Sequence, residues 1–352
     1  MRKIQVNASS SYNVIIENGA LARVGEYCLE ALGDACRVCI LTDTNVAPLY
    51  LERVKSGLLE SGFDTLEFVI ENGEASKSTE NLVRLVEFMA ENRLTRKDAL
   101  IALGGGVVGD LGGFAAAVYL RGIRFIQMPT TLLAAVDSSV GGKTAVDLRA
   151  GKNLMGAFYQ PTLVICDYST LDTLSTETFA DGCAEVIKYG IIGNKELFCK
   201  LQKGIEPQLE GIIAECVRMK ADIVEEDEHD NGKRQLLNLG HTVGHAIEAL
   251  SEFEVSHGSA VAIGTVIVSR AACKLGYFDK ADVDKVISLL RKEGLPTECP
   301  YSAKELFTVA TADKKRAGNE ISVVMPFGIG DCRLVKLPVC ELCEFIAKGL
   351  EV

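Results

Sequence analysis

The sequence has no tryptophan, and aromatic residues make up only 6% of its 352 positions. Positive charge is also scarce, because 37 Lys and Arg residues face 48 Asp and Glu residues, for a net charge of −11. This deficit argues against a surface for nucleic acids or anionic membranes, and an anionic ligand would need a local basic pocket. Prolines number 8 against 33 glycines, and 48% of the residues are hydrophobic. A disordered or fibrous protein is thereby excluded, and the length predicts about two domains.

A long uninterrupted hydrophobic run is also missing. The most apolar region, residues 99–120, is interrupted by Asp110 and six glycines, so we expect no transmembrane segment and no membrane partner. The N-terminal residues turn polar before an export signal could form, which predicts a cytoplasmic protein. Twelve cysteines are scattered from Cys28 to Cys343, and we expect them to be reduced, buried small side chains.

The first half of the chain alternates short apolar runs with helical patterns. The predicted strands are Val38–Leu41, Phe68–Ile70, Ala99–Leu103 and Phe125–Met128, and helical patterns at 46–60 and 78–92 lie between them. This alternation predicts an α/β domain with a mostly parallel, Rossmann-like sheet, in which ligands bind where strand C-termini meet helix N-termini.

The second half changes to long amphipathic stretches. We predict helices at 177–202, 208–226, 240–251, 257–275 and 280–293, and one hairpin at Ile321–Val324 and Arg333–Val335. The Ser/Thr-rich stretch 168–178 is the best boundary. The predicted domains are therefore an α/β domain at 1–170 and a mainly α-helical domain at 171–352, and the family resemblance described below implies that the first binds NAD and the second binds metal and substrate.

All four histidines lie between His229 and His257. His241 and His245 are four residues apart and share one face of a predicted helix, while His257 begins the next one. A catalytic zinc ion needs a third protein ligand, and Glu185, in an apolar segment, is the candidate. Ordinary polar contacts for the histidines, and a surface salt bridge for Glu185, remain the alternatives. Since Thr242 follows His241, the glutamate of the zinc-protease motif is missing.

A glycine-rich loop follows the strand predicted at Ala99–Leu103. Gly104, Gly106 and Gly109 have the G-x-G-x-x-G spacing, and amides at the start of a helix can hold a pyrophosphate. This motif alone is weakly specific. Asp43, after an earlier predicted strand, is suited either to accept hydrogen bonds from a ribose or to cap a helix.

Lysines beside glycines form a third group. Lys143 follows Gly141-Gly142, and Lys152 follows Gly151, so that ammonium groups could approach a bound phosphate. The loop is not a Walker motif, because Asp137 stands where its first glycine belongs. Solvated lysines in surface loops are the alternative.

Six segments in order, GGGVVGD, PTTLLAAVDSSVGGKT, GKN, GCAEVIKYG, LNLGHTVGHAIE and HGSAVAIG, resemble the 3-dehydroquinate synthase family over nearly the whole chain. The resemblance implies a homodimer with bound NAD and a divalent metal, zinc or cobalt. It implies conversion of an anionic small molecule, 3-deoxy-D-arabino-heptulosonate 7-phosphate, into 3-dehydroquinate and phosphate in the shikimate pathway. NAD would oxidise the substrate transiently, phosphate would leave by β-elimination, and the re-reduced product would close by an aldol step.

The resemblance also implies site residues. The implied metal ligands are Glu185, His241 and His257. The implied catalytic residues are His245, Lys143, Lys188, Asp137, Arg234 and Asn238, and the implied substrate-binding residues are Arg121, Lys152, Asn153, Lys314 and Lys315. The implied NAD-binding residues are Asp43, Asn45, Asn72, Gly73, Glu74, Lys77, Gly105, Gly106, Val107, Val108, Gly109, Asp110, Thr130, Thr131, Asp137, Lys143, Lys152, Thr170 and Thr173.

Three other functions are compatible with parts of this pattern. Another sugar phosphate cyclase would share the NAD and metal sites. A metal-dependent alcohol dehydrogenase of the glycerol dehydrogenase type would pair a GGG loop with histidines but would have no use for the basic residues. A nucleotide-binding regulatory protein would explain the glycines and leave Glu185, His241 and His257 without a role.

Overall fold

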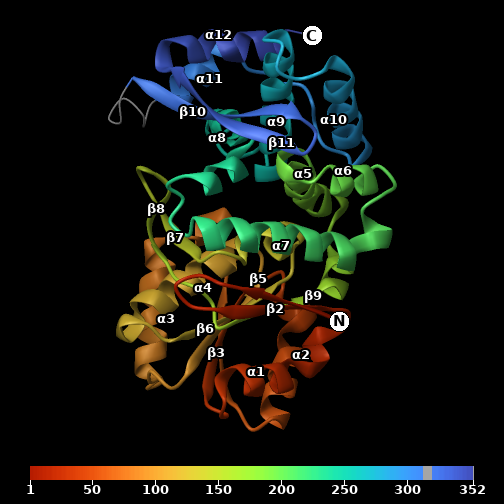
Figure 1. Ribbon diagram of the computed structural model, residues 1–352. Coiled ribbons are helices and arrows are strands. Elements are labelled where there is room, and N and C mark those ends of the chain that lie inside the picture. Colours follow the sequence, from red (N-terminus) through yellow and green to blue (C-terminus); the bar gives the residue numbers. More distant parts are fainter. Residues whose placement is uncertain (312–318, 352) are drawn as a thin grey trace. The chain divides into compact units, whose positions relative to one another are not determined.

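The computed structural model describes residues 1–311 and 319–351, and the chain forms two compact units (Figure 1). The first unit is Met1–Leu174 with Ile213–His229, and the second is Ser175–Ile212 with Asp230–Val352. The chain first passes from one unit to the other between Leu174 and Ser175, four residues after the predicted boundary at 170/171. The predicted domains place residues 213–229 in the second domain, whereas these residues belong to the first unit. Those residues form most of α7 (Leu209–Glu226), which the sequence pattern predicts as a helix without indicating which domain it joins.

The first unit is built on a seven-stranded sheet in the order β1-β2-β9-β6-β5-β3-β4. Only the β1/β2 pair is antiparallel among these neighbours, and the others are parallel. The strands are β1 (Arg2–Val6), β2 (Tyr12–Glu17), β3 (Arg37–Asp43), β4 (Asp64–Ile70), β5 (Ala99–Gly104), β6 (Arg124–Pro129) and β9 (Leu163–Asp167). The predicted mostly parallel, Rossmann-like fold is confirmed.

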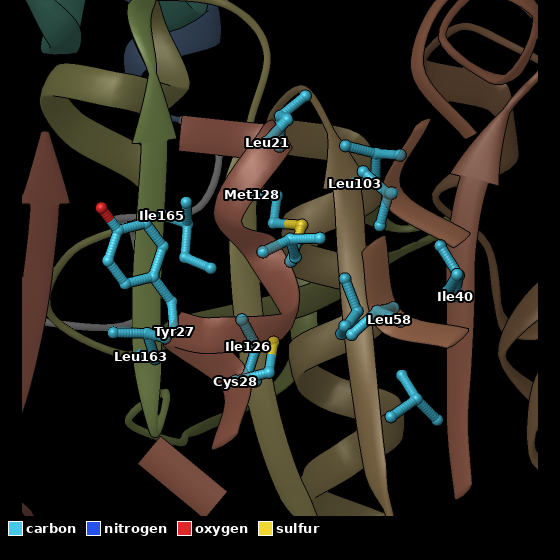
Figure 2. Packing of buried hydrophobic residues seen from close by; sticks show 14 of the residues in the cluster. Leu21, Tyr27, Cys28, Ile40, Leu58, Leu103, Ile126, Met128, Leu163 and Ile165 are labelled. Atoms are coloured by element: carbon cyan, nitrogen blue, oxygen red, sulfur yellow. The ribbon is translucent and has the colours of Figure 1, made fainter. Parts of the chain in front are cut away.

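Successive side chains of the central strands pack alternately into two hydrophobic cores, one on each face of the sheet. Ile40 and Ile126 belong to the core that also holds α1 (Val24–Leu32) and α2 (Glu52–Glu60), as Figure 2 shows for part of that cluster. Side chains of the opposite parity, such as Leu41, pack with α3 (Thr79–Glu91) and α4 (Gly106–Val118). Burial on both faces explains why these strands appear in the sequence as continuous apolar runs.

A separate antiparallel hairpin follows the sheet strand β6. It consists of β7 (Lys143–Leu148) and β8 (Gly151–Phe158), and α4 packs against β7. The sequence pattern does not predict this hairpin, because lysines beside glycines are typical of surface loops. The second strand is largely exposed, so it has no hydrophobic alternation that could have revealed it.

The second unit is mainly helical. Its helices are α5 (Thr176–Gly193), α6 (Lys195–Leu201), α8 (His241–Leu250), α9 (His257–Lys274), α10 (Lys280–Lys292), α11 (Ala303–Ala310) and α12 (Val339–Leu350). A hairpin of β10 (Glu320–Gly328) and β11 (Asp331–Pro338) completes it. Helix α9 packs against α8, α5, α12 and α10, and its buried residues extend round the helix.

Most helix boundaries match the predicted stretches, with one clear exception. The stretch 177–202 is two helices, because Asn194 ends α5 and its side chain accepts a hydrogen bond from Leu197 N at 2.9 Å, which caps α6. All twelve cysteines are free, as expected, but only six of them are buried, and Cys199 and Cys340 are exposed. In the described part of the chain, no helix combines the length and apolar character needed to cross a membrane.

Candidate active site

Three helices of the second unit bring one carboxylate and two imidazoles together. Glu185 lies in the middle of α5 and is only 1% exposed, while His241 and His257 are the first residues of α8 and α9. Glu185 Oε1 lies 3.6 Å from His241 Nε2 and 3.4 Å from His257 Nε2. One ligand atom from each residue lies within 4.8 Å of the other two. The set that the sequence pattern singled out therefore converges in space.

Close packing of α8 on α9 fixes the position of His241. Gly240, just before it, has φ of 78°, and a Cβ at this position would lie 2.5 Å from Thr265 Oγ1 and 2.7 Å from Val261 O. Glycine is required both for the left-handed conformation and for the short distance. The start of α8 is thus held against the second and third turns of α9.

Asp181 on α5 fixes the start of α9. Its Oδ1 accepts hydrogen bonds from the Ser256 hydroxyl and, at 3.0 Å, from Ser259 N. The carboxylate thus satisfies an amide in the first turn of α9, a role normally taken by the helix's own N-cap side chain. Asp181 lies four residues before Glu185, so one face of α5 supplies both the tether to α9 and the carboxylate beside His257.

Burial and charge have opposite effects on the two histidines. Burial lowers the pKa of His241 to about 3, so that its imidazole is neutral, as metal binding requires. Burial alone would also lower the pKa of His257, but the carboxylates of Glu185 and Glu248 raise it to about 10. Lys188 forms a buried ion pair with Glu185. Positive charge therefore surrounds the buried carboxylate.

The chemistry of this donor set fits a divalent cation. Two imidazole nitrogens and one carboxylate oxygen are the three protein ligands typical of a catalytic zinc site, which leaves a coordination position for water or substrate. The buried Glu185 carboxylate would be costly without positive charge close by. Zinc or cobalt could therefore be held by Glu185, His241 and His257.

The other predicted residues of this unit lie on the same or neighbouring elements. His245 is exposed, one turn after His241, and the two ring centroids are 5.4 Å apart. Arg234 and Asn238 lie on the 3-10 helix Lys233–Asn238, which precedes α8; Arg234 is 1% exposed, whereas Asn238 is exposed. Lys314 and Lys315 lie outside the described residues.

In the first unit, the glycine-rich loop connects β5 to the N-terminus of α4. A Cβ on Gly105 would meet Thr131 Cγ2 at 3.1 Å, and one on Gly109 would meet Gln127 Oε1 at 2.6 Å. Thr130 N donates to Gly104 O at 3.0 Å, so the ends of β5 and β6 are joined here. The amides of Gly106, Val107 and Val108 open α4, where helix N-termini bind phosphates.

A charge network lies beside this helix. Lys77, which is 5% exposed, pairs with Asp110 of α4 through an Nζ–Oδ2 distance of 2.6 Å. Glu74 Oε1 is 4.0 Å from Lys77 Nζ and 3.6 Å from Lys152 Nζ. Burial raises the pKa of Asp110, and Lys77 opposes this shift. The structure thus connects three predicted NAD residues with Lys152, which the resemblance places in both the NAD-binding and the substrate-binding sets.

The remaining predicted NAD residues lie at the ends of strands or in turns. Asp43 ends β3 and accepts hydrogen bonds from the amides of Asn45 and Val46, each at 2.9 Å, which closes the turn before the helix Ala47–Leu51 but does not cap that helix. Asn72 N donates to Thr44 Oγ1 at 3.1 Å, and Gly73 follows with φ of 103°. Thr170 and Thr173 lie in the 3-10 helix Tyr168–Thr173 that follows β9. Their hydroxyls donate hydrogen bonds to Asp167 O and Thr170 O, respectively.

The sequence reasoning missed Lys220. This lysine of α7 is 6% exposed, pairs with the Asp137 carboxylate and donates to Asp137 O at 2.7 Å. Its ammonium group also lowers the pKa of Asp110, against the larger effect of burial. A lysine among the apolar residues of an amphipathic helix was the available signal, but its partner could not be identified from the sequence.

The predicted phosphate-binding residues lie on the β7/β8 hairpin and the turn after α4. Lys143 begins β7 and is exposed, whereas Lys152 is partly buried near the start of β8. Asn153 has φ of 57°, and its amide donates to Asp147 Oδ1 at 2.7 Å. Arg121 also has a left-handed backbone, with φ of 66°, and is exposed.

Comparison with known proteins identifies the family. The family model for the 3-dehydroquinate synthase N-terminal region matches residues 67–181, and the model for the C-terminal region of the same enzyme matches residues 182–316. A 3-dehydroquinate synthase from Streptococcus suis (strain 05ZYH33) is 43% identical over 353 residues, which cover 98% of this chain and 99% of the relative.

Solved structures agree with this assignment. A 2-deoxy-scyllo-inosose synthase complexed with carbaglucose-6-phosphate, NAD+ and Co2+ has a TM-score of 0.88 at 25% identity, covering 99% of this chain and 100% of that one. A 2-epi-5-epi-valiolone synthase from Streptomyces hygroscopicus subsp. jinggangensis 5008, with NAD+ and Zn2+ bound, has a TM-score of 0.87 at 25% identity over 99% of each chain. Glycerol dehydrogenase from Schizosaccharomyces pombe, with a TM-score of 0.68 at 16% identity over 96% of this chain and 88% of that one, shares the fold alone. The chain belongs to the 3-dehydroquinate synthase family.

Proposed function

We propose that this chain converts 3-deoxy-D-arabino-heptulosonate 7-phosphate into 3-dehydroquinate and phosphate, with NAD and a divalent metal as cofactors. The convergence of Glu185, His241 and His257, in a chain 43% identical to a named synthase over almost its full length, is the observation that supports this most directly. The solved cyclases that contain NAD+ with Co2+ or Zn2+ support the same pair of cofactors.

Glu185, His241 and His257 would hold the metal. Bound there, the metal would polarise hydroxyl oxygens of the substrate and stabilise negative charge that develops on them. Lys188 keeps a positive charge against Glu185 in a buried environment, which favours the ionised carboxylate. His245 is exposed beside His241 and is suited to exchange protons with the substrate.

The first unit would bind NAD. Bound NAD supplies a transient oxidation of the substrate and is regenerated in the same turnover, which is why no NADH would accumulate. The amides at the start of α4 would receive the pyrophosphate, while Asp110 and Lys77 fix the neighbouring surface through their ion pair. Glu74 and Asp43 offer carboxylate oxygens to ribose hydroxyls.

The basic residues would bind the anionic groups of the substrate. Lys143, Lys152 and Asn153 are assigned to its phosphate, and Arg121 to a neighbouring anionic group. Arg234, Lys188 and Asn238 are assigned to the substrate in the second unit, and Asp137 to its reacting hydroxyl. Because Lys220 is paired with Asp137, we add it as the lysine that holds this carboxylate in place.

We also propose a homodimer in the cytoplasm, on the family resemblance and, for the compartment, on the twelve free cysteines. Sedimentation equilibrium of the full chain tests the dimer. A mass of one chain across micromolar concentrations would contradict it.

Phosphate release from the substrate by zinc-loaded protein, with catalytic NAD, tests the activity. We expect one 3-dehydroquinate, identified by mass and NMR, for each phosphate and no accumulation of NADH. Turnover of a different ketose phosphate would identify another cyclase instead. Net NADH from polyols would identify an alcohol dehydrogenase.

A further inference from the structure

The two histidines proposed as metal ligands are supported differently at their second nitrogen. His241 Nδ1 lies 3.0 Å from the carbonyl oxygen of Leu239, which belongs to the turn just before α8. His257 Nδ1 lies 3.4 Å from Glu248 Oε2, a carboxylate on another helix. In both rings Nε2 faces Glu185, so the Nδ1 contact decides the orientation in which Nε2 is presented.

Glu248 is placed for this contact by its position on α8. It lies seven residues, or two helical turns, after His241 on the same side of the helix and is 4% exposed. The chain then reverses through Glu252 and Phe253, which have φ of 51° and 66°, before α9 begins at His257. This left-handed turn brings His257 back to the carboxylate nine residues earlier in the chain.

A buried carboxylate at this nitrogen has a definite chemical effect. A ligating imidazole that donates its other N–H to a carboxylate is fixed in one tautomer and becomes a stronger ligand. When Nε2 of His257 binds the metal, the ring keeps its one proton on Nδ1, where Glu248 accepts it. The carbonyl of Leu239 does the same for His241 without a full negative charge.

We propose that Glu248 is a positioning residue that orients His257 and strengthens its binding to the metal. The inference rests on the proposed metal site at Glu185, His241 and His257. Glu248 touches neither the substrate nor the metal in this assignment and acts through His257.

His245, Glu248 and His257 also have ligand atoms within 4.8 Å of one another, so the same carboxylate could belong to a second metal site. That site would need His257 Nδ1, while the first site uses Nε2. Two simultaneous ions would require His257 to give up both of its ring protons, whereas one ion with Glu248 as hydrogen-bond acceptor does not. The geometry therefore favours the positioning role.

Zinc affinity of the metal-free, full-length chain tests this proposal. Competition with a chromogenic chelator gives the affinity and stoichiometry for the wild type, Glu248→Gln, Glu248→Ala and Glu254→Gln. Glu254 is an exposed glutamate of the same connection, so its variant controls for the loss of one negative charge near the site. The visible spectrum of each Co2+-loaded form reports the geometry around the ion independently of turnover.

We expect Glu248→Ala to weaken zinc binding by roughly 10- to 100-fold and to change the Co2+ spectrum. Glu248→Gln should lose less, because its amide oxygen still accepts from Nδ1–H. Glu254→Gln should match the wild type. If Glu248→Ala fails to fold, as judged by circular dichroism, a reduced zinc affinity of folded Glu248→Gln decides in favour of the proposal.

Unchanged zinc affinity and Co2+ spectra in folded Glu248 variants would overturn the proposal, as would an equal loss in Glu254→Gln. Two zinc ions per wild-type chain and one per Glu248→Ala chain would replace it with a second metal site. Glu185→Ala separates this inference from the proposed function. If that variant keeps full zinc affinity, the metal site itself is wrongly assigned, whatever the Glu248 variants do.

Discussion

The two proposed cofactor sites are built in contrasting ways. In the first unit, most of the nucleotide site comes from segments that follow consecutive strands, and backbone amides at the start of α4 provide many of its donors. In the second unit, three side chains from three helices meet around one carboxylate. A site made from strand ends depends on the sheet, which fixes many of its positions together. A site made from helix starts depends on a few interhelical contacts, so single substitutions should affect it more.

The largest expected effect is loss of the metal site without loss of NAD binding. Glu185→Ala removes the oxygen next to both histidines and should lower turnover by about 10³-fold, as expected when electrostatic stabilisation of a developing charge is lost. Metal content, phosphate release and NAD titration calorimetry measure the three quantities. Glu177→Gln, at an exposed position of the same helix, should leave all three unchanged. A parallel loss of NAD affinity in Glu185→Ala would mean that the two sites are not independent.

The next effect concerns the ion pair beside α4. Lys77→Met removes the cation paired with Asp110, a largely buried carboxylate whose side chain is 19% exposed, and should destabilise the fold by about 3 kcal/mol near neutral pH. Burial raises the pKa of Asp110 above its usual value, and losing Lys77 raises it further. An acid with a raised folded-state pKa destabilises the fold above that pKa, and the penalty disappears as the acid becomes protonated.

Urea unfolding of Lys77→Met should therefore show a larger loss at pH 7.5 than at pH 4.5, and Lys77→Met/Asp110→Asn should recover part of it. Lys55→Met, which removes a partly exposed pair with Glu67, should cost much less. Equal losses at both pH values would show that the pair with Asp110 is not the cause.

A smaller effect tests the helix contact that places His241. In Gly240→Ala, the new Cβ would lie 2.5 Å from Thr265 Oγ1 and 2.7 Å from Val261 O, on a backbone with a left-handed φ. We expect this variant to lose about 2 to 3 kcal/mol of its free energy of unfolding and to bind zinc more weakly. Gly276 has nearly the same φ, 79°, with nothing within 4 Å of its Cβ position, so Gly276→Ala isolates the backbone strain at about 1 kcal/mol. Urea unfolding and zinc competition compare the pair. If both variants lost the same free energy of unfolding, close packing around Gly240 would not contribute to the cost of Gly240→Ala.

The smallest expected effect is at the hairpin. Lys152→Ala should lower kcat/KM by about 10-fold, as for one lost charge-assisted hydrogen bond, with little change in NAD affinity. Steady-state phosphate release and NAD titration distinguish the two. Equal losses of kcat/KM and NAD affinity would assign Lys152 to the cofactor and not to the substrate. This outcome is worth testing because Lys152 Nζ lies 3.6 Å from Glu74 Oε1, and Glu74 is a predicted NAD-binding residue.

The parallel sheet, the helical second unit and the proposed metal ligands could be predicted from the sequence, because each depends on a short-range pattern or on a rare residue type. Continuous apolar strands identified the sheet, and four clustered histidines drew attention to His241 and His257. Lys220 was missed because its partner Asp137 is 83 residues away, and only the tertiary fold brings them together. The same limitation hid the membership of α7 in the first unit. The contact of Glu248 with His257 depends on a left-handed turn that no composition rule indicates.

The tether at Asp181 has a consequence for how the chain tolerates change. Asp181 holds the start of α9, and Glu185 lies one turn further along the same helix, beside the first residue of α9. Rotating α5 by one residue, about 100°, would remove both contacts together rather than shift one of them. A one-residue insertion between these two positions would instead turn the two side chains about 140° apart, where they are now about 40° apart, so α5 could keep only one of its two contacts with the start of α9.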